Sequence, residues 1–304
     1  MSDRTSMSTR QLAEALGVSE SSVKRWVDEG EIAADRTAGG HRRIPVSSAV
    51  GFIRTRRVRP ERPQLMPFSE VPDLGAVDSA CCDALYDALL EDSSHVARSI
   101  VCGRFMSGAS VATIGDGLLR PVLERIGELW KNDSRGILIE HRAVQTCTQA
   151  LSQIAAWIPE PAADAPVGVT AAGPADPYML PPTLAFMTLR ECGMRGVNLG
   201  PMTPLPTIEL AIAQYNAAIC VVSVSIVHEA GATGAWISLQ KRAAAAACRF
   251  VAGGRCVCSL DDRVASSTQI VGTMTELAAY ATGVVEGARL QAAPRRNQPR
   301  RKHA

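Results

Sequence analysis

Residue types that commonly bind nucleic acids are concentrated in the first 45 residues of this 304-residue chain. Lysine and arginine bind phosphate oxygens and guanine edges, and groups at the start of a helix donate to phosphates or bases. Such groups form two sets: Ser21, Ser22, Lys24 and Arg25, and then Arg36, His41, Arg42 and Arg43. We therefore expect these side chains to form a surface that binds double-stranded DNA.

A helix-turn-helix pattern places the first set on its second helix. Apolar residues at three- and four-residue steps predict a helix over residues 9–16, which Gly17 ends. Ser19 can then cap a second helix over residues 20–29, with Trp26 on its buried face. Because that face is turned inward, the basic side chains of the helix are expected to point outward.

The second set lies on a predicted hairpin. Residues 32–36 and 41–44 flank a turn with two glycines, and this spacing suits two short antiparallel strands. A short basic helix over residues 46–57 completes a predicted winged helix-turn-helix domain at residues 1–58. The hairpin is expected to bring its basic side chains to the DNA backbone beside the groove.

This order of helix, turn, helix and glycine-rich basic hairpin resembles the DNA-binding domain of the MerR family and its excisionase-like relatives. The resemblance rests on residues 19–30 and 36–43 and covers about the first 55 residues. It implies a regulator that binds double-stranded DNA. One short helix reads too few base pairs for useful specificity, so a homo-oligomer, either a dimer or a tetramer, is expected.

A proline-rich linker at residues 59–75 separates this domain from a helical region at residues 76–160. Apolar residues recur there at helical spacing, with a break at residues 133–136, and the length fits a bundle of four antiparallel helices. Within this region, Trp130 is followed after nine residues by Glu140 and His141.

The stretch from Gly127 to Arg142 resembles the helical bundle that precedes a cobalamin-binding domain in methionine synthase relatives and in light-sensing, CarH-type MerR repressors. The resemblance implies that Trp130 packs over the upper face of the cofactor, with Glu140 and His141 close to the adenosyl group. The alternative is that Trp130 anchors the bundle core, while Glu140 and His141 are solvated residues at a helix start.

The segment at residues 166–288 alternates short apolar runs with stretches of helix length. The runs occupy residues 167–172, 197–199, 219–224 and 249–252. This alternation predicts a parallel sheet with helices on both faces, of the Rossmann-like or flavodoxin-like class. Residues 289–304 hold six basic and no acidic groups, and we expect this tail to be disordered.

The cobalamin-binding relatives carry an Asp-x-His-x-x-Gly motif after the first strand, and its histidine is the lower axial ligand of cobalt. Here the corresponding stretch runs from Asp176 to Pro181, with Tyr178 in the place of the histidine and Pro181 in that of the glycine. A phenol is a poor cobalt ligand beside an imidazole, and proline lacks the backbone freedom of glycine. Adenosylcobalamin is thus a candidate cofactor, but coordination through this motif is not expected and the ligand is unknown.

Small residues at two later strand ends complete the predicted cofactor site. Ser223 and Ser225 match a Ser-x-Ser pattern that lines the nucleotide tail of cobalamin in the relatives, and Gly253 and Gly254 end the fourth strand. These small residues permit a nucleotide tail or a bare loop equally well. The predicted site comprises Trp130, Glu140, His141, Asp176, Tyr178, Ser223, Ser225, Gly253 and Gly254.

The charge distribution, the apolar runs and the cysteines further limit the class of protein. Residues 1–63 and 289–304 have an excess of basic groups, whereas the whole chain has a net charge of only +2, so its middle is acidic. Two basic ends favour a polyanionic partner through counterion release. No run approaches the ~18 apolar residues of a membrane span, and the cysteines include no Cys-x-x-Cys pair. We expect a cytoplasmic chain with reduced thiols, no metal site and no membrane contact.

These patterns predict a transcription regulator rather than an enzyme, and they indicate no catalytic residue. A small-molecule or protein effector on the cobalamin-type module would bias oligomer assembly and, through it, DNA binding. The alternative is a corrinoid-carrying methyltransferase component fused to a DNA-binding head. Methyl transfer through cobalt normally uses the axial histidine that Tyr178 replaces.

Overall fold

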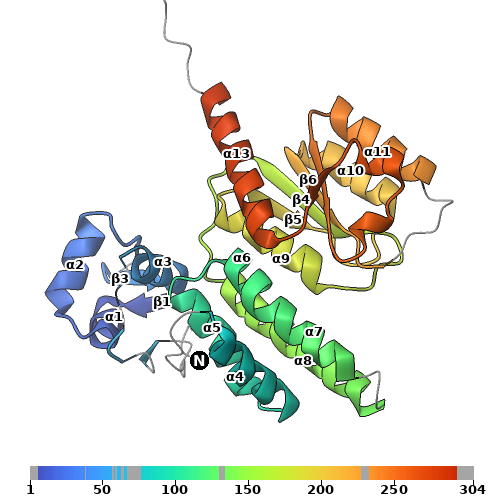
Figure 1. Cartoon of the computed structure of the whole chain (residues 1–304). Helices are drawn as coiled ribbons and strands as arrows, with labels where there is room; N and C mark the ends of the chain where they lie inside the picture. Colours follow the sequence, from blue (N-terminus) through green and yellow to red (C-terminus); the bar gives the residue numbers. More distant parts are fainter. Residues whose placement is uncertain are drawn as a thin grey trace, which may run out of the picture.

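The computed structural model describes residues 6–37, 39–56, 58, 60–62, 65–66, 77–129, 134–226 and 233–292. A small N-terminal head, a helical bundle and a parallel-sheet domain follow one another along the chain (Figure 1). The multidomain fold class predicted from the sequence is therefore confirmed. Among the described helices, none is both long and apolar enough to cross a bilayer.

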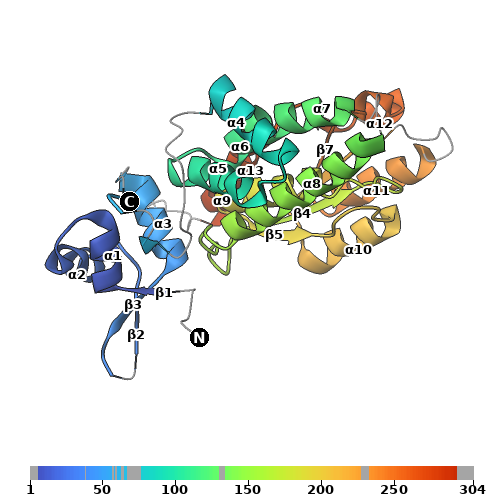
Figure 2. The same ribbon diagram turned by 90° about the horizontal axis from the view of Figure 1, so that it is seen from below.

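The head contains two short helices, a hairpin and a third helix. Its elements are β1 (Ser6–Ser8), α1 (Thr9–Leu16), α2 (Glu20–Asp28), β2 (Asp35–Arg36), β3 (Arg42–Pro45) and α3 (Val46–Arg56). Ser8 and Ser19 cap α1 and α2, and Gly17 ends α1 with a left-handed φ of 70°. The antiparallel sheet has the order β1-β3-β2, and its β2–β3 hairpin projects from the head (Figure 2).

The bundle follows as a set of long helices, one of which is interrupted. Its elements are α4 (Ser79–Leu90), α5 (Ser94–Met106), α6 (Val111–Ile114), the π-helical turn η2 (Gly115–Leu119), α7 (Arg120–Leu129) and α8 (Ser134–Ala155). Because α6, η2 and α7 follow one another without a gap, they form the third of the predicted helices. The π-helical turn widens the backbone spiral in its middle.

The third domain is a five-stranded parallel sheet with helical connections. Its main elements are β4 (Val167–Ala172), α9 (Leu180–Glu191), β5 (Arg195–Asn198), α10 (Leu205–Tyr215), β6 (Ile219–Ser223), α11 (Thr233–Ala245), β7 (Arg249–Gly253), α12 (Asp262–Ala265), β8 (Gln269–Val271) and α13 (Met274–Ala292). The strand order is β5-β4-β6-β7-β8, and Val169 of β4 is in register with Val197 and Cys220 on its two sides. This order is the flavodoxin-like one.

Two apolar layers hold the sheet. Helices α10 and α11 cover one face with residues such as Ile208 and Trp236, and α9 and α13 cover the other with residues such as Leu189 and Ala281. Helix α13 continues to Ala292, so the residues directly after position 288 extend this helix. The predicted start of a disordered tail at residue 289 is therefore wrong for residues 289–292.

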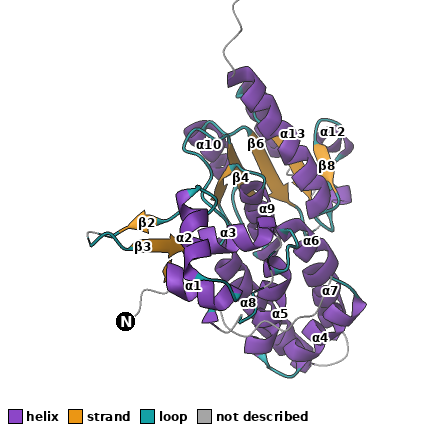
Figure 3. Ribbon diagram, turned by 90° about the vertical axis from the view of Figure 1, so that its left-hand side faces the viewer, coloured by secondary structure: helices purple, strands orange, loops and turns teal. Residues whose placement is uncertain are grey.

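The bundle packs on the α9–α13 face of the sheet domain (Figure 3). Asp116 of η2 accepts hydrogen bonds from the backbone N–H groups of Met274 and Thr275, both at 2.8 Å, and from the Thr275 hydroxyl at 2.7 Å. A carboxylate at a helix N-terminus satisfies free N–H groups and complements the helix dipole. The bundle thus caps the last helix of the sheet domain.

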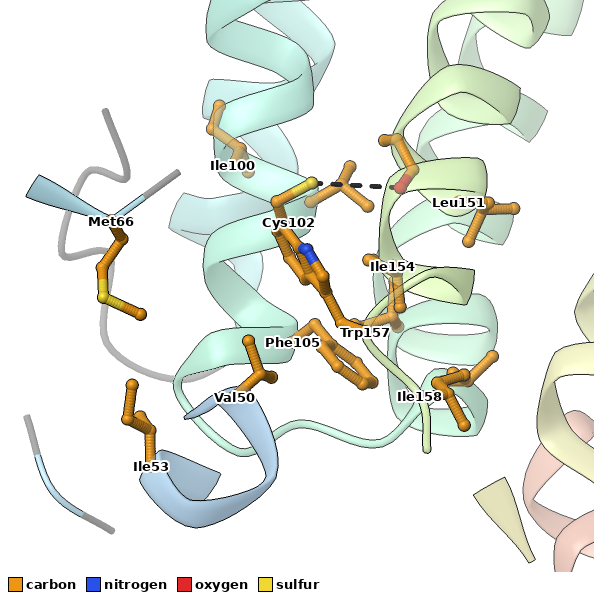
Figure 4. Packing of buried hydrophobic residues seen from close by; sticks show 14 of the residues in the cluster. Val50, Ile53, Met66, Ile100, Cys102, Phe105, Leu151, Ile154, Trp157 and Ile158 are labelled. Carbon is orange, nitrogen blue, oxygen red and sulfur yellow. Dashed lines mark hydrogen bonds between the residues drawn. The ribbon is translucent and has the colours of Figure 1, made fainter. Parts of the chain in front are cut away.

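The head packs on the bundle through a shared apolar core. Val50 and Ile53 of α3 belong to the same buried cluster as Phe105 of α5 and Trp157 beyond α8 (Figure 4). The rings of Phe105 and Trp157 lie 6.4 Å apart between their centroids. Continuous burial across this junction shows that the head, bundle and sheet domain make one contact network.

Candidate functional site

The N-terminus of α2 carries a cluster of three hydroxyl groups. The Ser19 oxygen accepts from the backbone N–H of Ser22 at 3.2 Å, and it lies 2.8 Å from the Ser21 hydroxyl and 2.9 Å from the Ser22 hydroxyl. Ser21 is exposed and Ser22 half-buried. A helix N-terminus with free N–H groups and hydroxyl donors is suited to phosphate oxygens or base edges.

The basic residues of α2 face solvent, and among the described residues their ion pairs are with carboxylates of the same helix or of its C-cap. The Lys24 ammonium lies 3.0 Å from the carboxylate of Glu20, and the Arg25 Nε atom lies 4.0 Å from that of Glu29. Hydrogen bonds from Thr9 and Lys24 lower the pKa of Glu20. Exposed pairs of this spacing contribute little free energy, so a phosphate can displace them.

On the hairpin, Arg36, His41 and Arg43 are exposed, whereas Arg42 is not. The side chain of Arg42 is only 24% exposed, and its Nη2 atom donates to the carboxylate of Asp28 in α2 at 2.6 Å. The structure thus places Arg42 in an internal contact that holds the hairpin against α2. The sequence analysis missed Asp28 as its partner, because only the fold brings the two residues together.

The bundle residues of the predicted site are described in part. Trp130 lies outside the described residues, so its place over the upper face of a cofactor stays a prediction. Glu140 is half-buried and His141 exposed in the first half of α8. The next residue, Arg142, donates to the carbonyl oxygens of Leu89 and Leu90 and fixes α8 against the end of α4.

At the carboxyl ends of the strands, Asp176 holds three loops together. Its fully buried carboxylate accepts from the backbone N–H of Tyr178 at 3.1 Å and from that of Ser225 at 2.7 Å. Its carbonyl oxygen accepts from the N–H of Met202 at 2.8 Å. The loops after β4, β5 and β6 therefore meet at one residue, and the carboxylate is engaged by the backbone of this chain.

Tyr178 is held by an arginine that the sequence analysis missed. The Arg255 Nη2 atom donates to the Tyr178 hydroxyl at 2.6 Å, and its guanidinium lies 4.6 Å from the centre of the tyrosine ring. Arg255 also donates through Nε to the Ser225 carbonyl oxygen at 2.9 Å. The one available signal was a basic residue directly after Gly253 and Gly254. Arg255 therefore engages the side chain of Tyr178, which stands at the position of the missing histidine.

The two glycines at the end of β7 permit backbone contacts within the chain. A Cβ atom on Gly253 would lie 2.8 Å from the Val271 carbonyl oxygen, and one on Gly254 would lie 2.6 Å from that of Val224. Gly254 also has a φ of 109°, which side-chain-bearing residues rarely adopt. Close approach of neighbouring loops therefore explains both glycines without a bound nucleotide tail.

The residues present do not fit cobalamin in the manner of the Asp-x-His-x-x-Gly motif. Tyr178 is paired with Arg255, the carboxylate of Asp176 is engaged, and Gly254 faces the backbone of Val224. Ser223 is the exception, since its buried hydroxyl has no hydrogen-bond partner among the described residues. One hydroxyl does not replace an axial nitrogen ligand.

Comparison with known families and structures gives separate findings for the N-terminal head and for the fold of a larger part of the chain. Residues 6–57 match a family described as helix-turn-helix domain. A search of curated proteins found no match. Among solved structures, the monomethylamine corrinoid protein of Methanosarcina barkeri is similar, with 15% identity, a TM-score of 0.52 and coverage of 67% of this chain and 98% of that one.

Two further solved structures have lower scores. The methanol:cobalamin methyltransferase complex of Methanosarcina barkeri has 13% identity, a TM-score of 0.36 and coverage of 72% and 86% of this chain and that chain. A cobalamin-binding protein of Desulfitobacterium hafniense has 17% identity, a TM-score of 0.33 and coverage of 69% and 96%. At such identities the likeness to the corrinoid protein concerns the fold alone. The chain thus joins a helix-turn-helix domain to a helical and parallel-sheet unit with the fold of a corrinoid protein.

Proposed function

We propose that this chain is a transcription regulator that binds double-stranded DNA through α2 and the β2–β3 hairpin. The observation that carries the proposal is the match of residues 6–57 to a helix-turn-helix family, together with exposed basic groups on both elements. In the MerR-type arrangement, α2 enters the major groove and the hairpin lies on the neighbouring backbone. Ser21, Ser22, Lys24 and Arg25 then face base edges, while Arg36, His41 and Arg43 contact phosphates.

We assign residues 1–58 to the DNA-binding domain, 59–75 to a linker, 76–160 to the bundle and 166–292 to the sheet domain. The role is binding rather than catalysis. One α2 helix covers few base pairs, so a dimer or tetramer provides the second half-site. Any effector that favours the assembled state then strengthens DNA binding by mass action.

The bundle and sheet domain serve as the effector module in this proposal. The Asp176, Tyr178 and Arg255 contacts fill the position where a corrinoid carrier needs its lower ligand, and they favour control by a different small molecule or by a protein. The same contacts weigh against the alternative of a methyltransferase component. Such a carrier needs a cobalt ligand at the position of Tyr178.

The proposal is tested by selecting binding sequences from a random duplex pool and measuring affinity by fluorescence anisotropy. Lys24→Ala and Arg25→Ala are expected to weaken binding and to change base preference by about 1–3 kcal/mol at the contacted positions. Arg195→Ala, on β5 of the sheet domain, is the control and leaves affinity unchanged. Failure of the unmodified chain to enrich any sequence, or unchanged binding in both α2 variants, contradicts the proposal.

A further inference from the structure

A cavity lies where the head, the bundle and the sheet domain meet. It has a volume of about 330 Å³, and its walls include Gly51 of α3, Phe105 at the end of α5, Trp157 beyond α8 and Arg190 near the end of α9. This size lies within the range of small-molecule sites. It stands apart from the carboxyl ends of the strands, where the predicted cofactor site lies.

One wall of the cavity includes an arginine that already binds an exposed carboxylate. Arg190 donates to the carbonyl oxygens of Ala155 at 3.4 Å and Ile158 at 3.1 Å and to the carboxylate of Glu160 at 2.7 Å. Its side chain is only 11% exposed, whereas that of Glu160 is 85% exposed. The Nε atom of Arg190 is buried and has no hydrogen-bond partner among the described residues.

This arrangement suits a carboxylate. A guanidinium binds a carboxylate through two parallel N–H groups, and such bonds are about twice as strong as neutral ones. Because Glu160 is solvent-exposed, it can return to water when a ligand carboxylate takes its place beside Arg190. Arg54 and Glu191 also line the cavity, but they pair with each other, so Arg190 supplies the positive charge that is available to a ligand once Glu160 leaves. A monoanion therefore fits better than a phosphate dianion.

The remaining walls are largely apolar. Phe105 and Trp157 line the cavity together with Pro159 and Pro161. The guanidinium of Arg54 lies 3.6 Å from the centre of the Phe105 ring. A Cβ atom on Gly51 would meet no atom within 4 Å, so the helix α3 side of the cavity is open. Phe105 and Trp157 are only 2% and 4% exposed, so an apolar group here would exchange water mainly for contacts with the proline side chains and the small exposed parts of the two rings.

We propose that this cavity binds a small monocarboxylate with an apolar body, anchored by Arg190. The ligand would contact α3 of the head on one side and α9 of the sheet domain on the other. By mass action, it would stabilise the arrangement in which the head is docked. Only the consequence for DNA affinity rests on the proposed function, because binding to the cavity does not depend on DNA.

The experiment is calorimetric titration of the full chain with indole-3-acetate and, separately, with indole-3-acetamide, which has the same shape but no charge. The acid is expected to bind at least about tenfold more tightly than the amide. Arg190→Gln should remove most of this preference, and Gly51→Leu should weaken both compounds by filling the cavity. The control, Arg195→Gln, changes an arginine of β5 outside the cavity and should bind like the unmodified chain.

Two results would overturn the proposal. One is the absence of saturable binding of indole-3-acetate, and the other is acid binding that neither Arg190→Gln nor Gly51→Leu weakens. Arg190 also contacts bundle carbonyl groups, so circular dichroism must show that the variant is folded, and Gly51→Leu provides an independent test. DNA anisotropy on the same samples separates the two proposals, since loss of one activity leaves the other measurable.

Discussion

The Arg54 guanidinium of the head lies 2.7 Å from the carboxylate of Glu191 at the end of α9. Arg54 also donates to the carbonyl oxygens of Phe105 and of Ala109, the latter at 3.0 Å, and the second Glu191 oxygen accepts from the N–H of Val111 at 2.7 Å. The two side chains are only 18% and 23% exposed. This pair therefore connects the head, the bundle and the sheet domain at one point.

The first prediction concerns pH. Burial raises the pKa of Glu191 above its ordinary value of 4.5, against the lowering effects of the Val111 N–H and Arg54. The folded state then binds the proton more tightly than the unfolded state, so stability falls as pH rises from about 4.5 through the folded pKa. In Glu191→Gln this fall is expected to vanish. Urea unfolding at several pH values measures it, with Glu160→Gln as an exposed control. An identical pH slope in Glu191→Gln and the unmodified chain contradicts the assignment.

The second prediction separates two neighbouring arginines of the hairpin. Arg42→Ala should lower the free energy of unfolding by about 1 kcal/mol, because it removes the charged hydrogen bond to Asp28. Arg43→Ala should leave stability unchanged but weaken binding to all duplexes and reduce the salt slope by about 0.9. Urea unfolding and anisotropy at several salt concentrations measure both. Equal effects of the two substitutions on stability would show that the hairpin contacts are misplaced.

The third prediction concerns the basic segment at residues 293–304, which lies outside the described residues and holds five lysine or arginine residues. Deleting it leaves α13 in place and removes charge without removing a base contact. Affinity is expected to fall by the same factor for specific and random duplexes, with a smaller salt slope. Competition between the two duplexes measures the ratio. A collapse of this ratio would mean that the segment reads sequence.

The fourth prediction concerns Gly254. Alanine at this position combines a φ of 109° with a Cβ atom 2.6 Å from the Val224 carbonyl oxygen, so we expect a loss of about 3 kcal/mol of stability. The matched control is Gly283→Ala in α13, where a Cβ atom meets nothing within 4 Å and alanine should stabilise by up to about 1 kcal/mol. Thermal and urea unfolding measure both. A stable Gly254→Ala variant would remove the close-packing explanation.

The fifth prediction concerns cobalamin. Because Arg255 engages the Tyr178 hydroxyl, hydroxocobalamin should show no spectral change from a protein nitrogen ligand when it is titrated with the unmodified chain. Free imidazole gives the reference spectrum for such coordination. Tyr178→His/Pro181→Gly is the matched comparison, in which a change towards that reference is expected. The same change with the unmodified chain would mean that the motif is misaligned.

The elements that the sequence predicts best are those with long apolar patterns. Strands β4 and β6 follow continuous buried runs, and α2 and α8 follow helical spacing, so local patterns sufficed for them. Strand β1 has only three residues, and β8 has three of which two are exposed, so neither shows a pattern. The order of the strands depends on contacts between distant segments, and the sequence left two fold classes open.

For the candidate site too, the sequence predicts local features but not contacts between distant residues. Residue types and spacing place the exposed basic groups on α2 and the hairpin, because solvent exposure follows from local amphipathic pattern. The pairing of Arg42 with Asp28 spans 14 residues, and that of Arg255 with Tyr178 spans 77. The sequence alone does not predict either pairing. Each pairing nevertheless decides whether a predicted contact residue, Arg42 or Tyr178, is available to a ligand.

The cap that Asp116 gives to α13 has a consequence for cooperativity. The N–H groups of Met274 and Thr275 and the Thr275 hydroxyl would lose the Asp116 carboxylate as their acceptor if the bundle moved away. If either the bundle or the sheet domain loosens, the other therefore also loses hydrogen bonds. The bundle and the sheet domain are therefore expected to unfold as one cooperative unit, and the head joins this unit through the Arg54–Glu191 pair and the shared apolar core.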